Sequence, residues 1–179
     1  MFEIKSLKKS DPSRKWHFVF QISAAVFLMA LVLFLMSVGS NSQLLWALGA
    51  GSLASSIFIV FTLPQSLAAE PRRLIGAYCL AIVIGVLTHV FLMHLFHAVT
   101  AHFILQNLRV FWISSALAMG ITMVLMIIFN CQHPPAAGVS IVLVLNIQEY
   151  TTVAVILFTA ILLALINYFL KDYLINLSG

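Results

Sequence analysis

A histidine followed by two prolines, His133-Pro134-Pro135, is the run in this chain whose residue types most clearly suggest chemistry. Proline lacks a backbone N–H, so it breaks a helix but fits the first turn of a new one. A helix that starts inside a membrane exposes free N–H groups and the positive end of its dipole, and such a terminus attracts anions. Histidine, with an ordinary pKa of about 6.5, could add a donor or a charge. We therefore expect His133, the two prolines and Ala136 to form a site for a small anion.

The same run has a structural interpretation, and its spacing leaves both interpretations open. A helix can begin at the prolines while the loop histidine bonds a neighbouring carbonyl oxygen. A water-accessible cavity that reaches His133 and Ser56 would favour solute binding. A dry, filled motif would favour a role in helix packing.

A polar linker at residues 64–73, bracketed by prolines, is the second candidate. Arg72, near its end, could attract an anion to a cytoplasmic entrance. Arg72 and Arg73 could equally anchor the next helix at the membrane interface. We expect Glu70 to pair with one of these arginines.

Two serines in short apolar segments complete the proposed site. Ser56 ends a block of small residues, 49–56, and Ser140 follows the two prolines. Their hydroxyls could contact a solute where the two halves of the chain meet. Small residues also let membrane helices approach closely, so packing is the alternative role for both serines.

The sequence offers few residues for a metal site or for catalysis. His94 and His97 share a helix face, but no acidic residue lies nearby, and the five acids of the chain are scattered. No Walker loop, nucleophile elbow or two-histidine metalloprotease motif occurs. We therefore predict no enzyme activity, no metal site and no cofactor. Cys79 and Cys131 are interpreted as buried residues without a disulfide.

The elements that must position these residues are membrane helices. The chain is 63% apolar and only 8% charged, whereas soluble domains carry about 25% charged residues. This composition predicts an all-α integral membrane protein without a separate soluble domain. The basic residues before the first apolar segment indicate orientation and contact with lipids, not nucleic-acid binding.

Six apolar segments form the predicted bundle, at residues 18–38, 44–63, 74–99, 110–129, 136–145 and 151–170. The fifth is too short for a straight span, which needs about 20 residues, so it either crosses with help from the preceding loop or re-enters. We expect a basic cytoplasmic tail at 1–17, a transmembrane domain at 18–171 and a C-terminal tail at 172–179.

The positive charges predict the orientation. If all six segments cross, eight of the nine Lys and Arg residues lie on the same side as the N-terminus. The positive-inside rule then predicts a multi-pass protein of the cytoplasmic (inner) membrane with its N-terminus in the cytoplasm.

The two halves share a pattern of a long, a short and a long apolar segment. The short ones carry Ser56-Ile57 and Ser140-Ile141 at similar places. This pattern favours a 3+3 inverted repeat, and in transporters with that plan the solute site lies where interrupted segments meet.

The chain resembles the HPP family of integral membrane proteins. Two blocks carry the resemblance: residues 61–72 with the following Ile75-Gly76, and the run from His133 to Ala136. Gly85 also falls where a family glycine is expected, and the matching order covers residues 49–146. Glu70 stands where the family often has glutamine. Because plastid and cyanobacterial members are associated with nitrite transport, the resemblance implies a transporter or channel for a small anion.

Our leading prediction is therefore a transporter or channel for a small monovalent anion, with nitrite as the best single guess. The expected partners are this anion and membrane lipids, and the small-residue faces also allow a homo-oligomer. The alternative is a non-transporting membrane scaffold or sensor component in which the histidine–proline–proline run serves helix packing.

Overall fold

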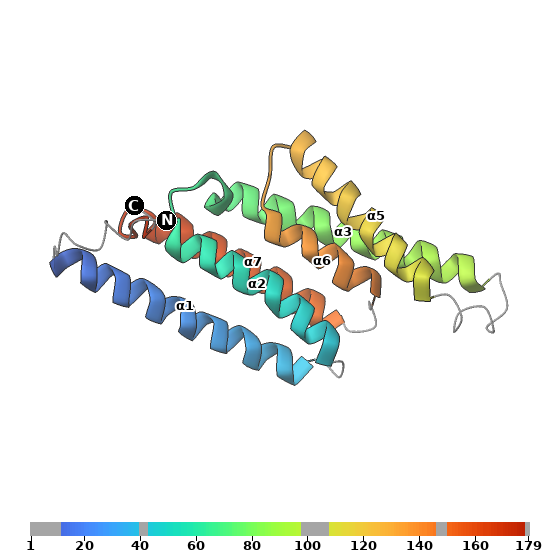
Figure 1. Ribbon diagram of the computed structural model, residues 1–179, viewed down its shortest axis with the longest axis horizontal. Helices are drawn as coiled ribbons and strands as arrows, with labels where there is room; N and C mark the ends of the chain where they lie inside the picture. The colour runs from blue at the N-terminus through green and yellow to red at the C-terminus, as the bar shows by residue number, and fades with distance from the viewer. Residues whose placement is uncertain (1–11, 40–42, 98–107, 146–149, 178–179) are drawn as a thin grey trace, which may run out of the picture.

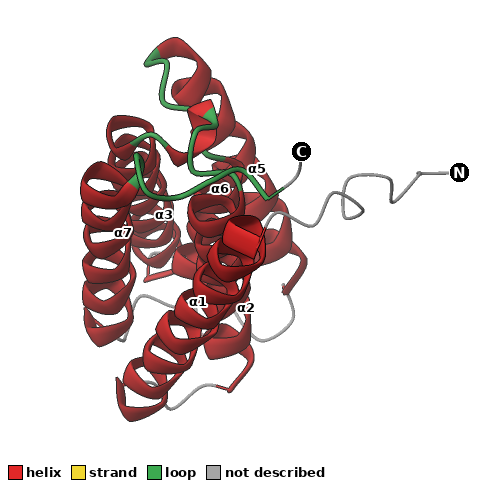
Figure 2. Cartoon of the chain, turned by 90° about the vertical axis from the view of Figure 1, so that its left-hand side faces the viewer, coloured by secondary structure: helices red, strands yellow, loops and turns green. Residues whose placement is uncertain are grey.

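The computed structural model describes residues 12–39, 43–97, 108–145 and 150–177 of the chain. Within these ranges the protein is helical, without strands (Figure 1, Figure 2). The elements are α1 (Pro12–Gly39), α2 (Gln43–Thr62), the short 3-10 helix η2 (Leu67–Ala69), α3 (Pro71–His97), α5 (Leu108–Ile128), α6 (Pro134–Leu145) and α7 (Tyr150–Leu170). The prediction of an all-α polytopic bundle is confirmed.

Four of these helices contain stretches long and apolar enough to cross a membrane, at Lys15–Leu35, Pro71–Leu95, Val110–Ile128 and Val153–Leu170. Two described apolar stretches are shorter, Gly49–Thr62 and Pro134–Leu145. This division matches the expectation of long segments with two short or interrupted ones. α1 begins at Pro12, earlier than the apolar segment expected from residue 18, so part of the predicted tail is helical.

The short helix α6 lies in the middle of the bundle, where it contacts α2, α3 and α5. Its 12 residues rise about 18 Å, well short of the roughly 30 Å of a hydrocarbon core. A helix that is apolar around its whole circumference is stable where other helices enclose it. The seven buried residues of α6 are Ala136, Ala137, Val139, Ser140, Val142, Leu143 and Val144.

The helix contacts follow the pattern that a 3+3 repeat requires. α2 packs on α1 as α6 packs on α5, and α3 packs on α5 and α6 as α7 packs on α1 and α2. The second helix of each half, α2 or α6, contacts its counterpart, as do the third helices, α3 and α7. Equivalent helices of the two halves therefore pair in the same pattern, with the course of the chain reversed (Figure 1).

α1 begins and α7 ends at the same end of the bundle (Figure 1). At this end the residues after α7 fold back over the end of α2, where Leu177 N–H donates to Thr62 O at 2.9 Å. The buried Gln21 side chain donates from Nε2 to Phe61 O at 2.7 Å and to Ile175 O at 3.0 Å. The bonds to Phe61 O and Thr62 O pair carbonyl groups that α2 leaves unsatisfied at its C-terminus.

Candidate functional site

Three polar side chains from separate elements meet inside the bundle. The Ser56 hydroxyl of α2 lies 2.7 Å from the Tyr78 hydroxyl of α3 and 2.7 Å from Nε2 of His133, in the connection between α5 and α6. Nδ1 of His133 lies 2.7 Å from the carbonyl oxygen of Ala68 in η2. All three side chains are 0% exposed. We call this group the Ser56–Tyr78–His133 network.

The partners determine which way the hydrogen bonds run. The Ala68 carbonyl can only accept, so Nδ1 of His133 carries the hydrogen and, in the neutral ring, Nε2 accepts. Ser56 therefore donates to His133, and Tyr78 donates to Ser56. Burial lowers the pKa of His133, although the bond to Ala68 opposes this effect, so the network favours a neutral imidazole.

The helices bring these side chains inward through ordinary helical periodicity. Ser56 lies on the same face of α2 as the buried Leu53 and Val60, three and four residues away. Tyr78 lies on the same face of α3 as the buried Leu74. A buried hydroxyl without a partner is costly, so each of these polar groups must find one within the bundle.

A turn at the end of α5 delivers His133 to the network. Asn130 has a φ of 52°, in the left-handed region that asparagine tolerates better than most residues. Its N–H donates to Ile127 O at 3.1 Å, and Cys131 N–H donates to Met126 O at 2.9 Å. This pair of bonds is a Schellman motif, which ends α5 and turns the chain back into the bundle.

The start of α6 does not present the free amides expected from the sequence. Pro134 and Pro135 lack N–H groups altogether, and Ala136 N–H donates to His133 O at 3.0 Å. The prolines that start the helix thus remove two of the donors that a helix N-terminus usually offers. At these three positions no backbone donor is available to an anion.

The family model described as "HPP, transmembrane region" matches residues 9–176. The chain belongs to the HPP family. It is also 30% identical over 99 residues to a transmembrane protein of Dictyostelium discoideum, a match that covers 55% of this chain but only 30% of that protein. No solved structure matches the chain.

The HPP motif is packed among other side chains, and His133 within it is fully buried. His133 and Ala136 are buried, Pro135 is half-buried and Pro134 is exposed. An apolar hollow of about 230 Å³ borders the motif from the α5 side and is lined by Met119, Met123, Met126, Ile127, Gln132, His133, Pro134 and Ala137. Since the His133 side chain has no exposed surface, this hollow adjoins the motif without wetting the imidazole. The filled motif favours a packing role for His133 in this conformation.

Of the polar residues expected opposite His133, the HPP fold brings Ser56 into direct contact but places Ser140 elsewhere. Ser140 is buried, and its hydroxyl donates to Ala137 O of its own helix at 2.7 Å. Its backbone packs on Gly85 of α3, where an added Cβ would lie 3.1 Å from Ser140 O and 2.8 Å from the Leu143 Cβ. Ser140 thus marks a close helix contact at the glycine that the family resemblance singled out.

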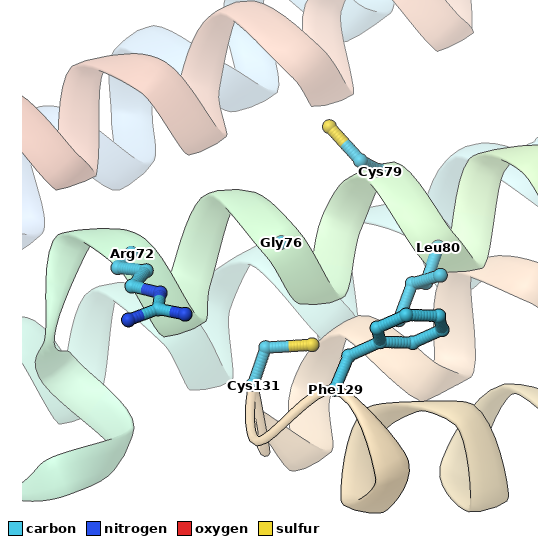
Figure 3. A pocket seen from close by; sticks show the side chains of 6 residues that line it. All are labelled: Arg72, Gly76, Cys79, Leu80, Phe129 and Cys131. Atoms are coloured by element: carbon cyan, nitrogen blue, oxygen red, sulfur yellow. The ribbon is translucent and has the colours of Figure 1, made fainter.

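The two arginines of the linker have different surroundings. Nε of Arg73 donates to Glu70 Oε2 at 3.0 Å, and its guanidinium also donates to Gln132 Oε1, beside His133. The expected pairing of Glu70 is therefore with Arg73. Arg72 is exposed and faces a hollow on α3 with Cys131 (Figure 3). It lies outside the network, and its predicted role at an entrance stays a prediction.

Sequence reasoning missed Tyr78, which has no neighbouring motif. The available signal was a tyrosine within an apolar stretch of the helix, because buried tyrosines usually need a hydrogen-bond partner. Among the other residues considered, His89 bonds the Val144 carbonyl through Nδ1 at 2.8 Å, and His94 is exposed. His102 and the side chain of His97 lie outside the described residues. The two cysteines are free, although Cys79 is exposed and only Cys131 is buried.

Proposed function

We propose that this HPP family protein transports a small monovalent anion across a membrane, with nitrite as the first candidate. The observation that carries the proposal is the Ser56–Tyr78–His133 network. Polar side chains inside a membrane bundle are costly, and they commonly mark a solute pathway. The network lies where the second helices of the two halves, α2 and α6, meet, and solute sites of inverted-repeat transporters lie at the interface between the repeats.

In this proposal the hydrogen-bonded network is the closed state of the transporter. Both imidazole nitrogens of His133 are occupied, by Ser56 and by Ala68, so an anion cannot bind the ring in this conformation. Separation of α2 from α6 would break the Ser56–His133 bond and free the Tyr78 and Ser56 hydroxyls. These hydroxyls are the donors we propose for the anion, in place of the α6 amides.

A second candidate function has an observation of its own. The three side chains of the network are buried and hydrogen-bonded to one another, which is also what a role in helix packing requires. The chain would then be a non-transporting membrane scaffold or sensor component. In that case the three side chains would never separate.

Uptake by purified full-length protein in liposomes tests the two candidates. The panel is nitrite, nitrate, formate, chloride and bicarbonate, each against protein-free liposomes. We expect uptake of at least one anion, and Ser56→Ala should change its rate. Ser115→Ala is the matched control, because Ser115 is also buried but donates to Phe111 O of its own helix, at 2.7 Å.

Two results would decide against transport through the network. Liposomes that take up none of the five anions would support the scaffold candidate. Uptake that Ser56→Ala and Ser115→Ala leave equally unchanged would remove the network from the pathway.

A further inference from the structure

A second hollow, of about 300 Å³, lies on the outer face of α3, beside the turn that follows α5. Its lining residues are Arg72, Gly76, Cys79, Leu80, Phe129 and Cys131 (Figure 3). Apart from the Arg72 guanidinium, the lining side chains carry only carbon and sulfur atoms. The hollow therefore combines one cation with an apolar floor.

The floor is formed by a close approach of the turn to α3. Cys131 points toward the α3 backbone at Gly76, between Arg72 and Phe129 (Figure 3). A Cβ added to Gly76 would lie only 3.1 Å from the Cys131 Cβ. The hollow is thus shaped by the same turn that delivers His133 to the network, but it opens on the opposite side, toward the outside of the bundle.

The charge of Arg72 is not neutralised by the described residues. No hydrogen bond or ion pair joins Arg72 to any of them, whereas the next residue, Arg73, is held by Glu70 and Gln132. The first turn of α3 has no acidic residue, so the positive end of the helix dipole adds to the charge. Burial raises the pKa of the Cys131 thiol, although Arg72 and Arg73 oppose this, so the thiol supplies no negative charge.

An exposed apolar stripe continues from the hollow along α3. Cys79, Val83, Leu87 and Val90 follow Arg72 at helical spacing and are exposed. Val83 lies about 16 Å along the helix from Arg72, which is about half the thickness of a hydrocarbon core. The stripe therefore begins at a cation at the end of the span and reaches as deep as a lipid acyl chain in one leaflet.

We propose that this hollow binds an anionic phospholipid, with the phosphate at Arg72 and an acyl chain over Gly76, Cys79 and Val83. Charge complementarity selects an anionic headgroup, and the apolar floor selects an attached chain. A free inorganic anion would find one cation and no further polar side chain in the hollow. This inference is independent of the proposed transport function.

Native mass spectrometry of the full-length protein tests the proposal. Detergent-solubilised protein is mixed with phosphatidylglycerol or phosphatidylcholine of identical acyl chains, and retained lipid is counted. We expect preferential retention of phosphatidylglycerol, reduced about fivefold by Arg72→Gln. Lys171→Gln is the matched control, since Lys171 is an exposed cation directly after α7, which ends at the end of the bundle where α3 begins (Figure 1).

A second variant and a photocrosslink test the apolar part of the hollow. Cys79→Phe should fill the hollow without changing charge and should lower retention of both lipids. A phosphatidylglycerol with a photoreactive acyl chain should crosslink to the peptide that contains Gly76 to Val83.

Three outcomes would overturn the proposal. Equal phosphatidylglycerol retention by Arg72→Gln and the unaltered protein would remove the cation from the site. Displacement of the lipid by water-soluble glycerol phosphate as readily as by intact lipid would indicate a free-anion site. Photocrosslinks that leave the peptide from Gly76 to Val83 unlabelled would remove the acyl chain from the stripe.

Discussion

Nε2 of His133 accepts a hydrogen bond from Ser56 at 2.7 Å, across 77 positions of sequence. The bond connects the start of α6 to the middle of α2, and Tyr78 and Ala68 extend it to α3 and η2. One imidazole thus holds four elements together. The predictions below follow from this relationship and from the close packing around it.

Ser56→Ala should destabilise the protein. The change removes the hydroxyl that pairs the buried His133 Nε2 and the buried Tyr78 hydroxyl, and leaving such groups unpaired costs about 1–3 kcal/mol of unfolding free energy. The measurement is thermal unfolding in detergent. Ser55→Ala is the control, because Ser55 is exposed and bonds Gly51 O of its own helix. Equal melting temperatures for the two variants would contradict the network.

Acidification should weaken the fold through His133. Its pKa is lowered in the folded protein, so below the ordinary value of about 6.5 the unfolded chain binds a proton that the folded chain does not. Stability is therefore retained above about pH 6.5 and lost as the pH falls toward the lowered value. Melting temperatures at about pH 7.5 and about pH 5.5 should differ more for the unaltered protein than for His133→Asn. The same pH dependence in both would show that His133 does not carry it.

Gly85→Ala should separate α6 from α3. Its Cβ would lie 2.8 Å from the Leu143 Cβ and 3.1 Å from the Ser140 carbonyl, and overpacking of this kind costs about 1–3 kcal/mol. Gly120→Ala is the matched helical control, because nothing lies within 4 Å of its added Cβ. That control should be neutral or stabilising, since alanine favours helix over glycine. Equal effects on the melting temperature would refute the close contact.

Asn130 should tolerate glycine but not valine. Its φ of 52° is unfavourable for β-branched side chains, so Asn130→Val should cost about 1–2 kcal/mol while Asn130→Gly should cost little. The measurement is the unfolding temperature of both variants, with the unaltered chain as reference. If valine is tolerated as well as glycine, the left-handed turn does not hold His133 in place.

The membrane bundle was predictable from the sequence because hydropathy and helix breaks are local properties. The apolar segments, the short helix after Pro134-Pro135 and the pairing of Glu70 with a neighbouring arginine all depend on residues close together in the chain. Membership of the HPP family also follows from motif order. Ser56 and His133 were named as opposite sides of one site, and they are in direct contact.

The state of that site depended on tertiary contacts. Both nitrogens of the His133 ring are occupied because the fold brings Ser56 and the Ala68 carbonyl to it from distant parts of the chain. Tyr78 could not be singled out, since nothing near it in sequence shows that its hydroxyl meets Ser56. Arg72 and Arg73 are adjacent in sequence but point to different surroundings, one to an outer hollow and one to Glu70 and Gln132.

The sequence by itself thus determined the elements, because the length of an apolar run and the missing N–H of proline act within a few residues. Only the tertiary structure decided which side chains satisfy one another. Inside a membrane bundle a polar group must find its partner on whichever helix face packs against it, and that face is set by contacts between residues far apart in the chain.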